Sequence, residues 1–234
     1  MNELLLLIDI DGTLLTTNGV AIQLMIRAAE AETGQSIPFC IGDYLGKLDP
    51  QIIETLLNRG GYDEKQILES RQRVYEHYIR AFKPALKEEH VTVYPGVREF
   101  LDYIQDLRLK FGVLTGNTRA GAGIKLGAVG FDRYFPFGAF GDDALTRPEL
   151  VPIAQSRAEQ HFRQPFFAKQ MWIIGDSVND IICARENGIR CCIVKTGKTD
   201  PEKLASLQPE ILVDNLENRE AIIREMKQIS NLSD

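Results

Sequence analysis

The stretch LLLLIDIDGT, residues 4–13, constrains the fold of this chain more than any other segment. Five apolar residues are followed by two aspartates, Asp9 and Asp11, which a single isoleucine separates. A short, continuous apolar run is typical of a strand buried on both faces, as in the interior of a parallel sheet. Two carboxylates this close repel each other unless a positive charge lies between them. The stretch therefore predicts a buried parallel strand that ends at a cation site.

Alternating strand and helix patterns continue through most of the chain. Short apolar runs that indicate strands occupy residues 110–115, 170–175, 189–194 and 210–213. Helical patterns occupy residues 97–107, 148–163, 178–188 and 218–229. Strands that alternate with helices are typical of βα units and a parallel sheet covered on both faces. We therefore expect an α/β fold with a doubly wound parallel sheet.

Residues 18 to about 88 interrupt this alternation. Three helical patterns, at residues 20–34, 49–61 and 63–86, follow one another without a strand between them. Asp49-Pro50 and Asp63 are suitable helix starts. We expect a core domain made of residues 1–17 and 88–234, with an inserted all-helical domain over residues 18–87. Residues 14–19 and 84–96 are the expected hinges between the two.

Composition excludes several classes of function. A net charge of −6 argues against a nucleic-acid surface, and no apolar run approaches the ~18 residues of a membrane span. The four cysteines form no C-x-x-C pair, and the three histidines are scattered, so zinc spacing is absent. The N-terminal apolar run is too short for a secretory signal. We expect a cytoplasmic protein with reduced, mostly buried thiols, Cys40 among them, that binds neither nucleic acid nor membrane and works as a monomer or homodimer.

Polar residues follow the first three core strands at the points where these strands end. In open α/β sheets, ligands bind beyond the carboxyl ends of the strands. A single Asp-Gly pair after a strand is an ordinary turn, but several carboxylates at one edge of a sheet form the ligand set of a hard cation, most often Mg²⁺. The sequence therefore predicts a Mg²⁺ site. Its expected ligands are Asp9, Asp11, Asp176 and Asp180, with Thr115, Gly116 and Asn117 beside them.

Three of these motifs together resemble those of a known superfamily. DIDGT, LLTGN and IIGDSVND are similar to the first, second and fourth motifs of the haloacid dehalogenase-like hydrolases. The resemblance covers nearly the whole chain, and it implies a Rossmann-like core. The helical insert resembles the cap domain of the phosphoglycolate phosphatase-like branch. The third motif departs from the usual Lys-Pro-x-Pro, because TRPELVP places Arg147 where a lysine is common. Lys125 and Lys169 are the alternative cations.

The resemblance also implies a role for each site residue. Asp9 would be the nucleophile that forms an aspartyl-phosphate, and Asp11 the general acid and base. Mg²⁺ would be held by Asp9, the backbone carbonyl of Asp11, and Asp176, with Asp180 supporting through water. The phosphoryl oxygens would contact the side chain of Thr115, the N–H of Gly116 and the neighbouring Asn117. Arg147 would add positive charge.

The segment between the first two insert helices is the expected substrate-facing loop. Gly46 would permit a close approach there, and Lys47 could meet the leaving group, although it can equally be a solvated lysine in a turn. An insert of this size suggests a small phosphorylated metabolite rather than a phosphoprotein. Phosphoglycolate and sugar phosphates both fit.

Four functions could use a chain with these motifs. A Mg²⁺-dependent phosphatase is favoured, because dehalogenases of this superfamily lack an aspartate at the position of Asp11. A phosphosugar mutase shares these residues. A non-catalytic binding protein would not need the complete set of motif residues. A receiver domain also gathers aspartates around Mg²⁺, but the insert and the D-x-D-G-T motif argue against it.

Overall fold

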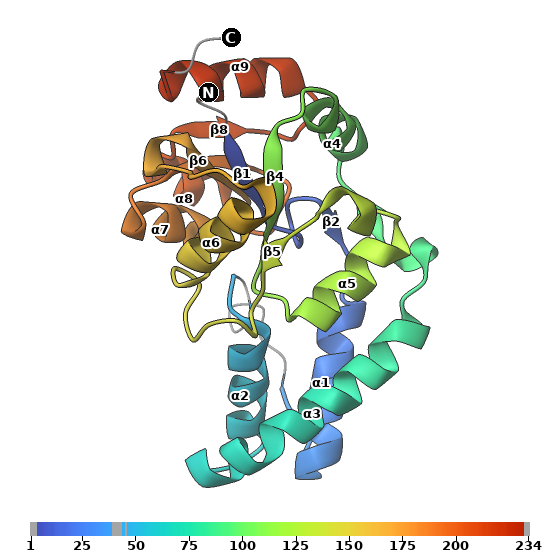
Figure 1. The fold of residues 1–234 in the computed structure, drawn as a ribbon. Coiled ribbons are helices and arrows are strands. Elements are labelled where there is room, and N and C mark those ends of the chain that lie inside the picture. Colours follow the sequence, from blue (N-terminus) through green and yellow to red (C-terminus); the bar gives the residue numbers. More distant parts are fainter. Residues whose placement is uncertain (1–3, 39–43, 45, 232–234) are drawn as a thin grey trace.

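The computed structural model describes residues 4–38, 44 and 46–231. Its centre is a sheet with the strand order β5-β4-β1-β6-β7-β8, in which every neighbouring pair is parallel (Figure 1). After β1 the chain forms β4 and β5 on one side of this strand, and it then forms β6, β7 and β8 on the other side. The strand β1 therefore lies at a topological switch point. The strands are β1 (Leu5–Ile8), β4 (Lys110–Leu114), β5 (Gly138–Ala139), β6 (Met171–Gly175), β7 (Arg190–Val194) and β8 (Ile211–Val213).

Side chains of β1 point alternately into two apolar clusters, one on each face of the sheet. Leu6 and Ile8 belong to the first cluster, whereas Leu5 and Leu7 belong to the second. Helices cover both faces, which confirms the predicted doubly wound α/β fold. The first cluster includes side chains of α4 (Val97–Asp106), α5 (Arg119–Ala128) and α9 (Arg219–Ile229), and the second those of α6 (Leu150–Phe162), α7 (Val178–Glu186) and α8 (Pro201–Ser206).

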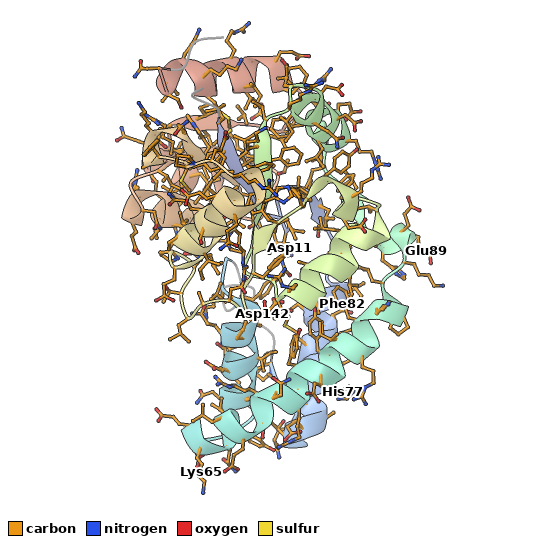
Figure 2. All side chains as sticks on the ribbon, viewed as in Figure 1. Asp11, Lys65, His77, Phe82, Glu89 and Asp142 are labelled. Atoms are coloured by element: carbon orange, nitrogen blue, oxygen red, sulfur yellow. The ribbon has the colours of Figure 1, made fainter. Side chains whose placement is uncertain are left out.

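Three helices pack together below the carboxyl edge of the sheet (Figure 1). They are α1 (Val20–Thr33), α2 (Asp49–Arg59) and α3 (Glu64–Ala85), and they enclose an apolar cluster of their own. The predicted start of α3 is confirmed, because the Asp63 side chain accepts from the N–H of Gln66 and the Gln66 side chain accepts from the N–H of Asp63. Figure 2 shows Phe82 on α3 and Asp11 at the edge of the sheet that faces these helices.

The chain enters and leaves this three-helix unit through two paired strands. β2 (Leu15–Thr16) and β3 (Thr92–Val93) are antiparallel, with Thr16 opposite Thr92. The side-chain amide of Asn18 strengthens the junction, since it donates to the carbonyl oxygen of His90 over 3.2 Å and to Thr92 Oγ1 over 3.0 Å. Both connections therefore run side by side.

The sequence patterns missed β2 and β3, which fall within the expected hinges, and also β5, α5 and α8. β5 has only two residues, which is too short for any alternation to show. The segment that forms α5 contains three glycines, which lower its helix propensity. It is helical because the Thr118 hydroxyl accepts from the N–H of Gly121 over 3.3 Å, and because Ala122 and Leu126 pack into the core. α8 has six residues and begins at a proline.

Two expectations from composition can be compared with the structure. No helix in the described ranges is long and apolar enough to cross a membrane. Cys183, Cys191 and Cys192 are buried free thiols, as expected, and burial raises the pKa of the Cys183 thiol to about 12. Cys40 lies outside the described residues.

Candidate active site

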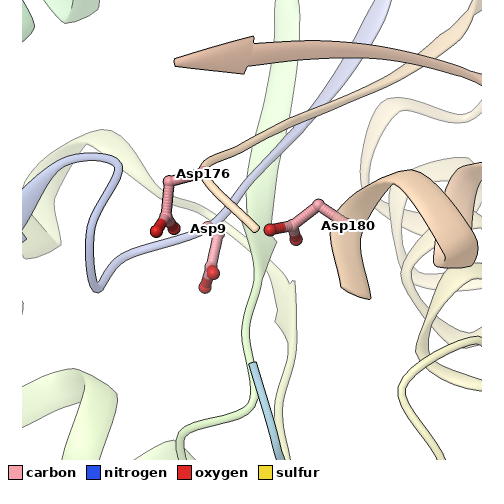
Figure 3. Close-up of side chains that lie close together, drawn as sticks. All are labelled: Asp9, Asp176 and Asp180. Atoms are coloured by element: carbon pink, nitrogen blue, oxygen red, sulfur yellow. The ribbon is translucent and has the colours of Figure 1, made fainter. Parts of the chain in front are cut away.

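Three buried carboxylates meet where β1 and β6 end. Asp9 directly follows β1, Asp176 directly follows β6, and Asp180 lies in the first turn of α7. Because β1 and β6 are parallel neighbours, their carboxyl ends adjoin. One side-chain oxygen from each aspartate lies within 4.8 Å of the others (Figure 3). The sequence analysis expected these three carboxylates together with that of Asp11, which instead contacts Lys125 Nζ over 2.6 Å.

Burial and neighbouring negative charges both disfavour charge on Asp9 and Asp176. Burial raises the pKa of Asp9 to about 6, and the charges of Asp180 and Asp11 act in the same direction. Burial likewise raises the pKa of Asp176 well above its usual range, with further contributions from Asp180 and Asp9. A cation among the three oxygens would offset this repulsion. The all-oxygen donor set fits a hard divalent ion such as Mg²⁺.

Two glycines leave room for the Asp176 carboxylate. A Cβ added to Gly12 or to Gly197 would collide with it. Gly12 also has a φ of 84°, in the left-handed region that favours glycine. The backbone thus forms a close-fitting cradle around this carboxylate.

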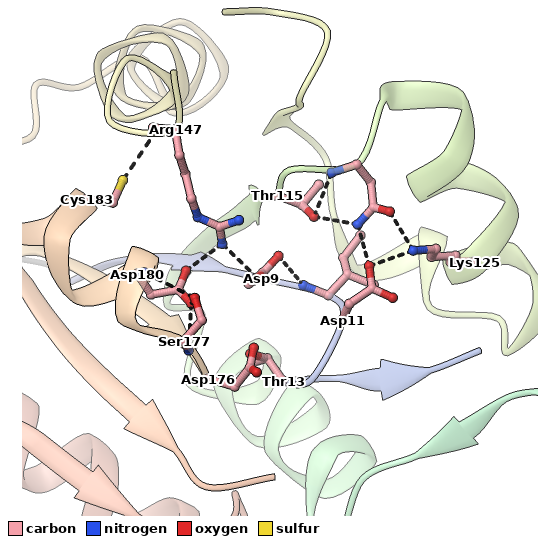
Figure 4. A network of polar contacts seen from close by, with 12 residues as sticks. Asp9, Asp11, Thr13, Thr115, Lys125, Arg147, Asp176, Ser177, Asp180 and Cys183 are labelled. Atoms are coloured by element: carbon pink, nitrogen blue, oxygen red, sulfur yellow. Dashed lines mark hydrogen bonds and ion pairs between the residues drawn. The ribbon is translucent and has the colours of Figure 1, made fainter. Parts of the chain in front are cut away.

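Arg147 supplies positive charge between two of the three carboxylates. Its Nη2 lies 2.8 Å from Asp9 Oδ2 and 2.5 Å from Asp180 Oδ1 (Figure 4). The guanidinium is 7% exposed, and it precedes α6. Lys169, one of the two alternative cations, is the wrong choice: it is exposed and lies in the short turn before β6, at the opposite end of that strand from Asp176.

The residues after β4 adjoin these carboxylates from the other side of β1. Thr115 is fully buried, and its Oγ1 accepts from the side-chain amide of Asn117 over 2.8 Å. Gly116 is in close contact with another segment, because a Cβ there would collide with the carbonyl oxygen of Lys47. The predicted polar groups of this loop therefore lie beside Asp9 and Asp11.

A second cation contacts Asp11 directly. Lys125, on α5, is 4% exposed, and its Nζ lies 2.6 Å from Asp11 Oδ2. The sequence suggests Lys125 only as a substitute for Arg147, whereas the structure contains both cations (Figure 4). A lysine in the otherwise apolar and glycine-rich segment AGAGIKLGA, residues 120–128, was the available signal.

Gly46 and Lys47, which precede α2, lie at this edge of the sheet. Gly46 has a φ of 67°, and a Cβ on it would collide with the Asn179 side chain of α7. Gly46 and Lys47 both line a cavity of about 150 Å³ between the sheet and the three-helix unit. Asp9, Asp11, Thr115 and Arg147 line the same cavity, and Ala21, Met25 and Ile52 form an apolar wall. Leu45 lies outside the described residues.

Asp49 joins α2 to the loop after β4. It is 5% exposed, its N–H donates to the carbonyl oxygen of Gly116 over 2.7 Å, and its Oδ2 accepts from the N–H of Thr118 over 2.9 Å. Burial raises the pKa of its carboxyl from 3.8 to about 6. Above pH 6 the folded protein therefore buries a charge that the unfolded chain keeps in water.

We expect Asp49→Asn to stabilise the protein at pH 8 and not at pH 4. An asparagine oxygen can still accept from Thr118, while the cost of the buried charge is removed. That cost is lost as the pH falls through 6, because the folded state then takes up a proton. The gain in unfolding free energy at pH 8 should be up to about 3 kcal/mol. Urea unfolding of the wild type and the variant at pH 8 and pH 4 measures this gain. An equal loss of stability at both pH values would contradict the prediction.

Comparison with known proteins agrees with this geometry. The family described as haloacid dehalogenase-like hydrolase matches residues 6–194, so the chain belongs to that family. This confirms both the resemblance seen in the motifs and the prediction that the protein is a hydrolase.

Individual relatives are distant but cover nearly the whole chain. A phosphoglycolate phosphatase from Pseudomonas syringae pv. tomato is 25% identical over 217 residues, which are 91% of this chain and 76% of the relative. A hydrolase from Pseudomonas syringae has a similar structure, with a TM-score of 0.72 and 18% identity over 95% of this chain and 99% of that one. The β-phosphoglucomutase of Clostridium difficile reaches a TM-score of 0.73 at 14% identity, over 97% and 98% of the two chains. These two structures support the fold.

Proposed function

We propose that this protein is a Mg²⁺-dependent phosphatase that hydrolyses a small phosphorylated metabolite through an aspartyl-phosphate. The observation that carries the proposal is the buried cluster of Asp9, Asp176 and Asp180, which lies against a cavity of about 150 Å³ also lined by Asp11. A cavity of this size suits a phosphate ester of a small metabolite such as phosphoglycolate or a sugar phosphate. The names of the phosphoglycolate phosphatase relatives support the same reaction class.

In the proposed reaction, a carboxylate oxygen of Asp9 attacks the phosphorus, and the bond to the leaving oxygen breaks. Asp11 donates a proton to that oxygen and later takes one from the water that hydrolyses the aspartyl-phosphate. Arg147 orients Asp9, while the Thr115 hydroxyl and the Gly116 N–H hold phosphoryl oxygens. Asp9, Asp176 and the backbone carbonyl of Asp11 would hold Mg²⁺, with Asp180 supporting through water, and the ion would neutralise charge on the phosphoryl group.

The three-helix unit is the cap domain in this proposal. We propose that residues 18–87 form the cap, and that residues 1–17 and 88–234 form the core. Gly46 and Lys47 would then meet the leaving group from the cap side, since both line the cavity. A cap that closes over the site would exclude water during phosphoryl transfer.

The first experiment is phosphate release from p-nitrophenyl phosphate and then from a panel of small phosphorylated metabolites. We expect activity with Mg²⁺ and none after chelation. Asp9→Asn serves as the matched inactive control. Absence of phosphate release from every substrate would contradict the proposal.

Metal binding should also be visible without turnover. Mg²⁺ at 100 times its Kd should stabilise the wild type by about 2.7 kcal/mol. Asp176→Asn should be at least as stable as the wild type without metal, because it removes a buried charge, but it should gain nothing from Mg²⁺. Thermal unfolding with Mg²⁺ or EDTA measures both effects. Equal stabilisation of the two proteins by Mg²⁺ would argue against this metal site.

A phosphosugar mutase is the second candidate, because the structural neighbours include a β-phosphoglucomutase. The products separate the two reactions. A phosphatase releases one phosphate for each substrate consumed, whereas a mutase yields an isomeric sugar phosphate in excess of free phosphate. A non-catalytic binding protein would bind the metabolite without either product.

A further inference from the structure

The ammonium group of Lys125 is buried beside the candidate acid and base of the reaction. Two acceptors surround it: Asp11 Oδ2 at 2.6 Å and Asn117 Oδ1 at 2.5 Å. A buried lysine is costly unless it is paired, so these contacts hold the side chain in place. The proposed reaction does not otherwise use this lysine.

Asn117 completes a ring with these two residues. Its Oδ1 accepts from Lys125, which has no acceptor to offer, so the amide can take only one orientation. Its Nδ2 is consequently directed at Asp11 Oδ2, over 2.6 Å, and at Thr115 Oγ1, over 2.8 Å. Lys125 thus contacts Asp11 directly (Figure 4) and also acts on it through Asn117.

The two carboxyl oxygens of Asp11 differ in the hydrogen bonds that they accept. Both donors converge on Oδ2. Among the residues that the structure describes, none donates to Oδ1. The Asp11 side chain is 43% exposed and lines the cavity, so one carboxyl oxygen remains available to a ligand.

We propose that Lys125 is a positioning residue that, together with Asn117, fixes the Asp11 carboxyl so that Oδ1 is kept for proton transfer. This inference rests on the proposed function. The proton on Oδ1 passes to the bridging oxygen as the P–O bond breaks, which leaves Asp11 as a carboxylate. Oδ1 then takes a proton from the water that attacks the aspartyl-phosphate. Oδ2 accepts hydrogen bonds from Lys125 and Asn117 throughout.

The dependence of rate on the leaving group tests this role. A positioned general acid matters most when the leaving oxygen is strongly basic, and it contributes about 10²–10⁴-fold. The value of kcat/KM reports the steps up to formation of the aspartyl-phosphate, so it isolates the first proton transfer from the later hydrolysis. We would measure it for ethyl, phenyl, p-nitrophenyl and 2,4-dinitrophenyl phosphate.

Lys125→Met should lower kcat/KM for ethyl phosphate by about 10²-fold or more, and by less than about 10-fold for 2,4-dinitrophenyl phosphate. Asp11→Asn should show the same steep dependence on leaving-group basicity. Adding Lys125→Met to Asp11→Asn should then cost little more, because both variants remove one function. Lys169→Met, an exposed lysine far from the site, is the matched control and should behave as the wild type.

Asn117→Ala is the second variant, and it leaves the Lys125–Asp11 pair intact if Lys125→Met does not fold. This variant should also lose more kcat/KM on substrates with more basic leaving groups. A uniform loss across the four substrates in either variant would overturn the inference, because a merely structural role affects all leaving groups alike. Failure of the proposed function would instead appear in the wild type, as no activity on any substrate, and the inference would fall with it.

Discussion

Asp9→Asn should reduce phosphate release by about 10⁴–10⁶-fold while the protein stays folded. The amide has the shape of the carboxylate but cannot attack phosphorus. Stability should not fall, since burial already disfavours the charge of Asp9, whose pKa is raised to about 6, and Arg147 keeps its contact with Asp180. Steady-state kinetics and urea unfolding measure the two effects.

Acid quenching of the wild type during turnover should trap the mass of one phosphoryl group on the peptide that contains Asp9. The asparagine variant should trap none. Intact-mass analysis is needed alongside the kinetics, because slow deamidation would regenerate the aspartate and restore activity. Unchanged activity in a variant shown to carry asparagine would exclude Asp9 as the nucleophile.

Removal of the positive charge at Arg147 should affect both stability and rate. Arg147→Met leaves Asp9 and Asp180 buried without their cation, which should cost about 3–5 kcal/mol in unfolding free energy at pH 8 without metal. The loss should shrink at pH 5, because Asp9 then takes up a proton. Activity should fall about 10²–10³-fold.

Arg147→Lys is the matched control, because it keeps the charge that the third motif of the family commonly supplies as lysine. We expect activity within about 10-fold of the wild type, and most of the stability retained. If the lysine and methionine variants behaved alike, the planar guanidinium itself would be required, and charge alone would not explain the role of Arg147.

Elements with strong local signals were predicted to within a residue or two. β6 is a continuous apolar run, β7 is apolar after its first residue, Arg190, and α3 begins at a capping aspartate. β5 and α5 had no such signal. The two residues of β5 pair only because β4 lies beside them, and α5 is helical in spite of its glycines because the core binds its apolar side.

The residues of the candidate site also differ in whether a local sequence pattern predicts them. Asp9 and Asp176 follow strands with clear apolar patterns, so the rule that ligands bind at strand ends is enough to predict that the two converge. The contact of Lys125 with Asp11 spans 114 residues, and that of Asp49 with Thr118 spans 69. Such contacts depend on which side of α5 faces the sheet and on how α2 docks against the loop after β4. No local pattern specifies either arrangement.

The pairing of β2 with β3 has a topological consequence. The chain leaves β2 at Thr16 and returns in β3 at Thr92, the residue directly opposite. The number of residues between β2 and β3 therefore does not affect the six-stranded sheet, since a two-residue hairpin turn would close the same gap. Insertions and losses within the three helices can accumulate without changing the register of any strand in the sheet. Under the proposed function, substrate choice could therefore change through the three helices while Asp9 and Asp176 stay at the ends of their strands.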